Sequence, residues 1–323
     1  RPRYHPGLLR ASGIDGAKLP ELLPVDAELG EVLPAVAAEL GLSSGVVVTA
    51  PVNDTCAAGI GCAAFTGDHA GVSIGTTSVM ITHVGKQRTD IRNAIVSMPS
   101  PLPGVFLVMA ENGIGGRALE HFLEKLVFAR DGFVDSEASD DHDKFAALHR
   151  ALAESRPGAG GVLFLPWLSG SLAPAEDGRV RGGFLNMSLD TRRADLAQAV
   201  LEGVAFNFRW LREPVEGFVG RRLSHLYFFG GGAKSDHWAQ VLADVMQLPV
   251  HQAGDPDYVA CRGLARLAFH RRGLLSRDEL AAAPPSVAVR EPRREWAAGY
   301  DRAFAQFRRA FHANRRIFHA LND

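Results

Sequence analysis

The sequence predicts an α/β protein, because the same local pattern occurs three times along the chain. In each case an apolar strand runs into a polar or glycine-rich turn and then into a segment that favours a helix. The strands cover residues 46–49, 105–109 and 226–229, and the turns after them lie at residues 53–54, 111–116 and 230–233. Such alternation is typical of a sheet flanked by helices.

Composition indicates a globular protein with a real core and a small ligand. The 323 residues are 46% hydrophobic and 22% charged, and this length predicts two domains or one large elaborated domain. The 35 Lys and Arg residues against 36 Asp and Glu residues give a net charge of -1, which argues against nucleic acid or an anionic membrane as a partner. A small neutral or locally anionic ligand fits better, and a homodimer remains open.

Cysteine content and hydropathy indicate the cytoplasm. Cys56, Cys62 and Cys261 form no CxxC pair and are odd in number, which argues against a disulfide framework and a structural zinc site. No stretch approaches the roughly 20 apolar residues of a membrane span, and no signal region opens the chain. The chain starts with Arg-Pro-Arg and no Met, so we expect it to be the later part of a longer protein.

The first elements are short. Apolar residues at helical spacing in the run 29–40 predict a helix that ends at Gly41, and a strand follows at residues 46–49. Small residues dominate positions 55–65, which predicts a helix packed closely against another backbone. Residues 71–84 alternate apolar and polar on both sides of Gly75-Thr76-Thr77, which is typical of a β-hairpin.

The later elements are longer and more apolar. The strand 105–109 leads into a helix whose predicted apolar face consists of Leu119, Phe122, Leu123 and Leu126. A buried strand at residues 162–168 precedes a loop at 169–177, and one apolar stripe predicts a helix over 193–212. After the strand 226–229 a helix passes through Trp238 and Val245, and spaced phenylalanines predict an amphipathic terminal helix from Tyr300 onward.

Two glycine turns lie at strand ends, where ligands bind in open α/β sheets. At residues 75–78 we expect Gly75 to allow an unusual backbone angle, while Thr76, Thr77 and Ser78 offer hydroxyls and amides that could form an anion nest. An ordinary hairpin turn explains this tetrapeptide equally well and is favoured when it is considered alone. Residues 230–232 lack the GxGxxG spacing of a dinucleotide fingerprint, so a tight turn is favoured there too.

Acidic residues offer two further candidates. Asp54 stands between a strand and a helix, where an N-cap is the favoured interpretation and a general base that takes a proton from a bound hydroxyl is the alternative. Asp141, His142 and Asp143 are metal-ligand residue types, but their acidic surroundings and the lack of a second cluster favour a solvated loop.

The order and spacing of these segments resemble the FGGY family of carbohydrate kinases, in its xylulokinase-like branch. The resemblance is carried by residues 53–61 (NDTCAAGIG), 67–68 (GD), 72–78 (VSIGTTS) and 229–244 (FGGGAKSDHWAQVLAD). Residues 115–116 (GG), 163–168 (LFLPWL), 181–184 (RGGF) and 199–206 (AVLEGVAF) agree with it, so it extends to about residue 275. It implies two ribonuclease-H-like domains, as in actin and hexokinase, that close around ATP and a sugar.

The resemblance also implies the roles of individual residues. Asp54 would be the general base for the sugar hydroxyl and the one carboxylate near Mg²⁺. The terminal phosphates of ATP would be gripped by the turn of Gly75, Thr76 and Thr77. Gly116 and Glu120 would approach the nucleoside, and the pocket for the α-phosphate and adenosine would be lined by Gly231, Gly232, Ala233 and Asp236. Phosphoryl transfer suits this arrangement, because its catalysis is mostly positioning and charge stabilisation.

On the same resemblance the chain divides into three parts. Residues 1–66 would be the tail of the N-terminal, sugar-binding domain, residues 67–280 the nucleotide-binding domain, and residues 281–323 a C-terminal helical extension. Because most sugar-binding residues of the family belong to an N-terminal domain that this chain lacks almost entirely, we expect the 323 residues alone to be inactive.

The implied reaction is ATP-dependent phosphorylation of a ketopentose such as xylulose. The alternatives are a family member that acts on ribulose, glycerol or gluconate, and a non-catalytic nucleotide-binding module or pseudokinase. Two departures bear on the choice. The usual Gly-Glu-Arg-x-Pro loop reads Gly170-Ser171-Leu172-Ala173-Pro174 here, and a histidine common after the Gly-Phe segment is replaced by Leu189-Asp190.

Overall fold

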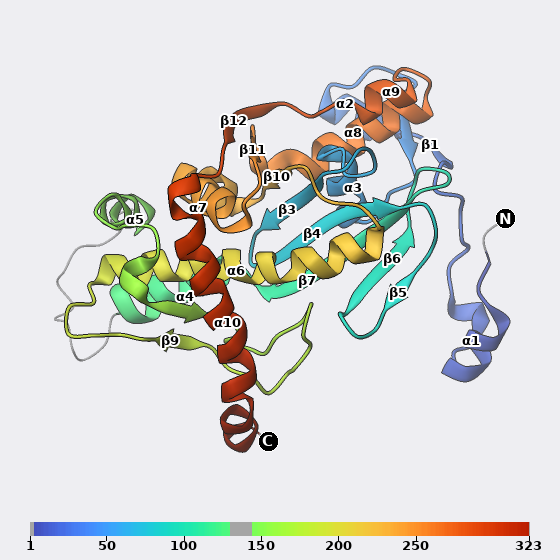
Figure 1. Ribbon diagram of the computed structural model, residues 1–323. Helices are drawn as coiled ribbons and strands as arrows, with labels where there is room; N and C mark the ends of the chain where they lie inside the picture. Colours follow the sequence, from blue (N-terminus) through green and yellow to red (C-terminus); the bar gives the residue numbers. More distant parts are fainter. Residues whose placement is uncertain (1–2, 130–143, 323) are drawn as a thin grey trace.

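One large mixed sheet lies between two layers of helices in the computed structural model, which describes residues 3–129 and 144–322 (Figure 1). Within these residues the sheet has eight strands in the order β12-β11-β10-β3-β4-β7-β6-β5. β3, β10 and β11 run parallel, and every other neighbouring pair is antiparallel. The strands are β3 Ala70–Ile74, β4 Thr77–Val84, β5 Thr89–Asp90, β6 Ile95–Pro99, β7 Phe106–Ile114, β10 Leu226–Phe229, β11 Val250–Ala253 and β12 Ser286–Arg290.

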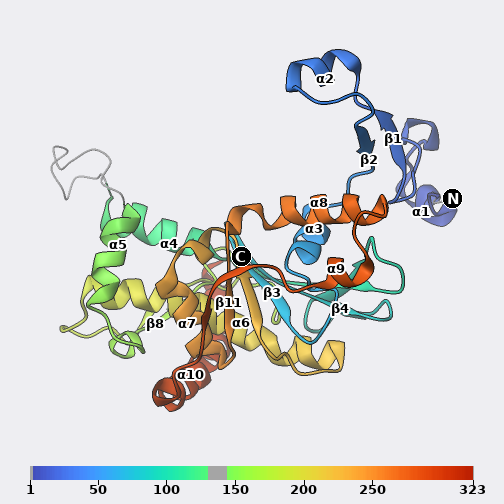
Figure 2. The ribbon, with the colours of Figure 1, turned by 90° about the horizontal axis from the view of Figure 1, so that it is seen from above.

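Helices cover both faces of this sheet (Figure 2). One face carries α4 (Gly116–Phe122), α5 (Lys144–Ala153), α6 (Arg193–Val219), α7 (Asp236–Met246) and α10 (Arg294–Leu321). The other face carries α3 (Asp54–Gly61), α8 (Val259–Arg271) and α9 (Arg277–Ala281). Successive strand residues point to opposite faces, so Phe228 joins the first cluster and Phe229 the second. The predicted α/β class is therefore confirmed.

The N-terminal segment stands apart from the sheet (Figure 2). It contains α1 (Pro6–Ser12), α2 (Pro34–Leu40) and the antiparallel pair β1 (Glu28–Glu31) and β2 (Val47–Thr49). The predicted helix over 29–40 is wrong in its first part, because residues 28–31 pair with β2. The helix begins at Pro34, a residue suited to a first helical turn, and ends as predicted at Gly41, whose φ is 67°.

The small-residue helix α3 packs directly on α8, as the sequence predicted. A Cβ atom at Gly61 would overlap the carbonyl oxygen of Val259, and one at Gly263 would overlap that of Ala57. Glycine at both positions lets the two helix backbones approach each other, which sets the position of α3 and of Asp54 at its start.

Two helix predictions need correction. The helix that begins at Gly116 changes after Phe122 into a π-helical turn over Leu123–Val127, in which the Phe128 amide donates to the Leu123 carbonyl at 2.8 Å. The wider turn shifts the angular spacing, so Leu126 is 59% exposed and does not belong to the apolar face. The helix predicted over 193–212 continues through Pro214 to Val219 as α6.

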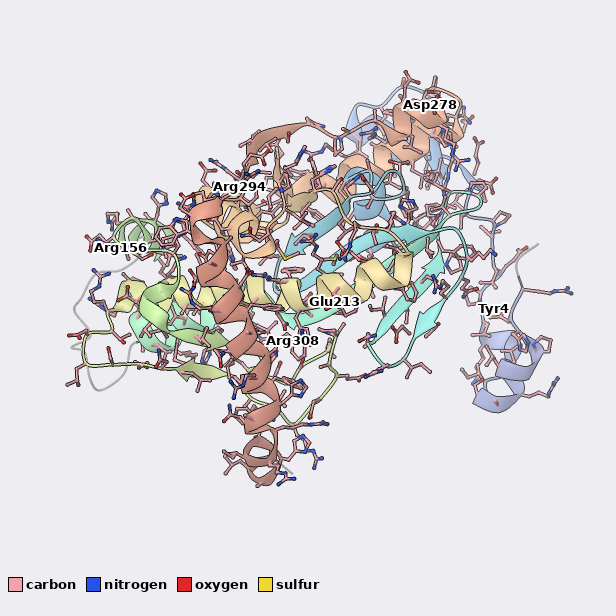
Figure 3. The ribbon with its side chains drawn as sticks, viewed as in Figure 1. Tyr4, Arg156, Glu213, Asp278, Arg294 and Arg308 are labelled. Atoms are coloured by element: carbon pink, nitrogen blue, oxygen red, sulfur yellow. The ribbon has the colours of Figure 1, made fainter. Side chains whose placement is uncertain are left out.

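The terminal helix α10 belongs to the core. Its Tyr300, Phe307 and Phe311 are buried, while Arg308 is exposed and its guanidinium lies over the ring of Trp210 (Figure 3). The remaining elements are β8 (Leu163–Leu165), its antiparallel partner β9 (Gly183–Leu185), and the 3-10 turns η1 (Gly16–Lys18), η3 (Ala159–Gly161), η4 (Gly231–Lys234) and η5 (Pro256–Tyr258). In the part of the chain described, none of the helices has the length and hydropathy needed to cross a membrane.

Residues 141–143, which carry metal-ligand residue types, lie outside the described residues. The boundaries at residues 66 and 280 stay predictions. The last part of the chain is not only helical, because β12 pairs with β11 and extends the sheet before α10 begins.

Candidate active site

Three turns meet at the end of β3, around Ile74 and Gly75. The Gly75 carbonyl accepts the Gly116 amide at 2.6 Å, which joins the β3–β4 turn to the start of α4. On the other side, a Cβ atom at Gly232 would lie 2.9 Å from the Ile74 Cβ, so the turn after β10 presses against the same strand end. The structure thus brings together the predicted residues Gly75, Thr76, Thr77, Gly116, Gly231, Gly232 and Ala233.

The first of these turns differs from the prediction in its backbone. β3 and β4 form an antiparallel hairpin, as expected, but Gly75 does not have a positive φ, so the expected unusual backbone angle at Gly75 is wrong. The close approach falls on Gly116 instead, where a Cβ atom would lie 2.7 Å from the Gly75 oxygen. The Gly75 amide donates to the Thr77 carbonyl at 2.9 Å, so it is already used inside the turn.

A cavity of about 300 Å³ opens beside this turn. Its lining combines the turn, the end of β7, the start of α4 and the loop after β8: Thr76, Thr77, Glu111, Gly113, Ile114, Arg117, Ser169, Gly170, Ser171, Leu172, Glu176 and Gly178. The exposed hydroxyls of Thr76 and Thr77 and the guanidinium of Arg117 are hydrogen-bond donors at the start of a helix, which suits phosphate oxygens. Ser171 and Leu172, where the family usually has charged residues, line the same cavity.

Sequence reasoning missed Glu111, Arg117 and Glu176. Glu111 and Arg117 flank the glycine turn at residues 113–116, and this position beside a strand end was the available signal. Glu176 had no comparable signal, because its place in the cavity depends on how the loop 169–178 folds back toward β7. One hydrogen bond of that contact joins the Ala173 amide to the Glu111 carbonyl at 2.9 Å.

Asp236 and Glu120 flank the three turns in different ways. Ser235 caps α7 by accepting the Trp238 amide at 3.1 Å, which leaves the Asp236 carboxylate free for other partners. Asp236 accepts from Gln252 at 3.0 Å and pairs with Arg290 at 2.9 Å. The hydrogen bond from Gln252, with the Arg290 charge, holds the pKa of Asp236 below its usual value. Glu120 is exposed on α4, one turn after Gly116.

Asp54 is the first residue of α3 but not its N-cap. The cap is Asn53, whose side-chain oxygen accepts the Cys56 amide at 2.7 Å, so the capping interpretation of Asp54 is wrong. The Asp54 carboxylate is exposed rather than buried, and it accepts the Thr55 amide at 2.8 Å. Within the described residues no group of three His, Cys, Asp or Glu side chains could hold a metal ion. The roles of Asp54 as general base and as neighbour of a metal ion stay predictions.

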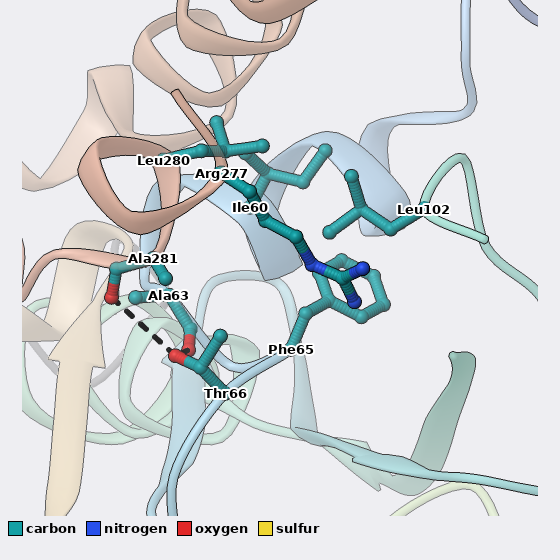
Figure 4. Close-up of a pocket in the computed structure, with 8 residues that line it drawn as sticks. All are labelled: Ile60, Ala63, Phe65, Thr66, Leu102, Arg277, Leu280 and Ala281. Carbon is teal, nitrogen blue, oxygen red and sulfur yellow. Dashed lines mark hydrogen bonds between the residues drawn. The ribbon is translucent and has the colours of Figure 1, made fainter. Parts of the chain in front are cut away.

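A second, smaller cavity lies between α3 and α9 (Figure 4). It measures about 20 Å³, enough for a single water molecule at most. The Thr66 hydroxyl at its edge donates to the carbonyls of Ala63 at 3.1 Å and Ala281 at 3.4 Å. These contacts tie α9 to the end of α3, and the space is too small for a substrate.

The fold is that of an actin-like ATPase domain, and three glycine-rich turns meet at the end of β3. The family model described as FGGY family of carbohydrate kinases, C-terminal domain, matches residues 70–271. The chain therefore belongs to the FGGY family of carbohydrate kinases.

Relatives with different substrates match the chain at similar levels. The xylulose kinase of Staphylococcus epidermidis is 28% identical over 231 residues, covering 72% of this chain and 44% of that protein. The glycerol kinase of Thermus brockianus is 30% identical over 250 residues, covering 75% and 46%. The crystal structure of a xyloylose kinase from Brucella ovis superposes with a TM-score of 0.81 at 28% identity, covering 99% of this chain and 62% of that chain. The chain thus spans about half the length of the curated relatives it matches.

Proposed function

We propose that the protein transfers the terminal phosphoryl group of ATP to a hydroxyl of a ketopentose such as xylulose, in the cytoplasm. The observation that carries this proposal is the meeting of three turns at Ile74 and Gly75 beside a cavity lined by hydroxyls and a guanidinium. Xylulose kinases among the relatives support the ketopentose, and the glycerol kinase at comparable identity makes a polyol the main rival.

In this proposal the chain holds the nucleotide. Thr76 and Thr77 would bind the terminal phosphates through their hydroxyls, with Arg117 as a further donor from the cavity wall. Gly116 and Glu120 would lie along the nucleoside. Gly231, Gly232, Ala233 and Asp236 would line the pocket for the α-phosphate and adenosine. Gly231 is exposed there, while Gly232 is buried and lets the turn pack against Ile74.

Asp54 would take the proton of the attacking hydroxyl. Its exposed carboxylate has no bonded partner beyond Thr55 among the described residues, so it is free to accept a hydrogen bond from a substrate. The same carboxylate fits a Mg²⁺ ion that the nucleotide brings, because such an ion takes most of its ligands from phosphate oxygens and water. When bound, the ion would neutralise charge on the transferring group.

In the proposed division, residues 1–66 are the tail of a sugar-binding domain, residues 67–280 the nucleotide-binding domain and residues 281–323 an extension. The sugar would then bind largely outside these 323 residues, which alone should have negligible kinase activity. A homodimer stays a prediction.

The proposal is tested with the full-length gene product in a coupled assay of ADP release across ketopentoses, polyols and aldonates. We expect the highest kcat/KM with a ketopentose, and Asp54→Asn should abolish turnover while binding of an ATP analogue persists. Unchanged turnover in this variant would remove Asp54 as the base. Nucleotide binding with no activity on any acceptor would favour the non-catalytic module instead.

A further inference from the structure

The loop 169–178 lines the cavity but is held from outside it. Asp177 is 8% exposed and is not among the residues that line the cavity, although its neighbours Glu176 and Gly178 are. One of its oxygens accepts the Arg315 Nε at 2.6 Å, and His319 Nε2 lies 2.7 Å from the same oxygen and 3.0 Å from the other. Both partners belong to α10, which lies beyond the family match at residues 70–271.

The base of the loop is closed, so movement at Asp177 must move its neighbours. The Ser171 amide donates to the Asp177 carbonyl at 3.0 Å, and the Asp177 amide donates to the Ser171 carbonyl at 2.9 Å. A Cβ atom at Gly170, whose φ is 96°, would lie 3.0 Å from the Gly178 Cα, so the two ends cross in close contact. The Asp177 carboxylate also accepts the Arg179 amide at 3.0 Å, which fixes the direction in which the chain leaves the loop.

The same helix supports the start of the loop. Trp167, two residues before Ser169, is buried against Phe307 and Phe311 of α10, with ring centroids 5.0 and 4.9 Å apart. α10 is therefore in contact with the chain at both ends of the loop, through an apolar contact just before it and a charged contact near its last residue. Because the apolar contact is deep in the core, the charged contact is the part that can be removed without unfolding α10.

We propose that Arg315 and His319 are positioning residues that hold the loop 169–178 in the shape that nucleotide binding requires. The identity of the ligand, a nucleotide, rests on the proposed function. The anchoring of the loop by α10 rests on the observed contacts alone. The side chain of Arg315 is 51% exposed, so its contribution to global stability is small, whereas Arg315→Ala removes a charged partner from Asp177, which is only 8% exposed.

The test compares Arg315→Ala with Arg316→Ala in the 323-residue chain. Arg316 is the next residue of α10 and is exposed, and its side chain makes no hydrogen bond or ion pair with the described residues, so it serves as the matched control. Amide hydrogen exchange reports on Ser171, Ala173 and Asp177, and calorimetry reports the Kd of a non-hydrolysable ATP analogue. Urea midpoints show whether either variant alters global stability.

We expect Arg315→Ala to raise exchange at these three amides about tenfold. The Kd should rise on the order of 2- to 30-fold, and the urea midpoint should fall only slightly, since one contact of the whole chain is lost. Arg315→Lys should restore much of the amide protection and of the nucleotide affinity, because a single donor, Arg315 Nε, makes the contact. His319→Gln should have a smaller effect than Arg315→Ala, because the glutamine amide can still donate an N–H.

Equal exchange in Arg315→Ala and Arg316→Ala would overturn the anchoring, and faster exchange with an unchanged Kd would overturn the positioning role. If the wild-type chain binds no nucleotide, the proposed function fails, while the exchange data still decide whether α10 holds the loop.

Discussion

Gly263→Ala tests the close contact that positions α3. The added Cβ would overlap the Ala57 carbonyl oxygen and lie 2.7 Å from the Gly61 nitrogen and 2.8 Å from the Ala57 carbonyl carbon. Contacts of this kind are comfortable at about 3.5 Å, so the contact with the Ala57 carbon alone needs a shift of about 0.7 Å, and the overlap with the oxygen needs a larger one. All the atoms met are backbone, which cannot rotate away, and we expect a loss of about 1–3 kcal/mol in the free energy of unfolding.

Urea unfolding followed by far-UV circular dichroism measures this loss, with Gly299→Ala as the control. Gly299 lies inside α10 and a Cβ atom there would meet nothing within 4 Å, so alanine should stabilise the helix by about 0.5–1 kcal/mol. The two identical substitutions should therefore act in opposite directions. If Gly263→Ala were as stable as the wild type, α3 and α8 could not be in the contact described, and the placement of Asp54 would lose its support.

Two further predictions concern pH and the site. Burial and two neighbouring histidine rings lower the pKa of His225 from 6.5 to about 4, so between these values the unfolded chain binds more protons and stability falls as pH decreases. Because the ring is partly exposed, the free energy of unfolding should fall by on the order of 1–2 kcal/mol between pH 7.5 and pH 4.5, as measured by urea unfolding at each pH. This fall should be smaller in His225→Asn. An equal fall in the variant would mean that other groups cause it. Gly116→Ala puts a methyl group 2.7 Å from the Gly75 oxygen and should weaken binding of an ATP analogue about tenfold by calorimetry, which an unchanged Kd would contradict.

Local elements were predictable where their signal was local. The strand 226–229 has the predicted ends, and the glycine turns were recognised because glycine and strand ends mark them directly. The π-helical turn that exposes Leu126 leaves no trace in apolar spacing, and the strand at residues 28–31 exists only because β2 pairs with it. The strand therefore depends on a partner that its own residues do not reveal, and the π-helical turn is closed by a local bond from Phe128 to Leu123 that apolar spacing does not mark.

The site shows the same limit more sharply. Three turns could be chosen from the sequence, but the cavity beside one of them is completed by a loop that begins at Ser169, and that loop is tied by Asp177 to Arg315, 138 positions along the chain. An arginine on an amphipathic helix is in most cases solvated, so periodicity gives no reason to expect Arg315 to bind a buried carboxylate. Only the folded arrangement distinguishes Arg315 from Arg316 beside it.

The choice between Asn53 and Asp54 has a functional consequence that propensity could not foresee. Both residue types are good N-caps, so assigning the cap to Asp54 from the sequence had no physical advantage over assigning it to Asn53. The structure uses the neutral amide of Asn53 for the cap and leaves the carboxylate of Asp54 exposed in the first turn. A carboxylate committed to the cap would have its oxygen bonded to a backbone amide two or three residues on. An exposed one can receive a proton from a bound hydroxyl, provided that α3 stays where its glycine contact with α8 places it.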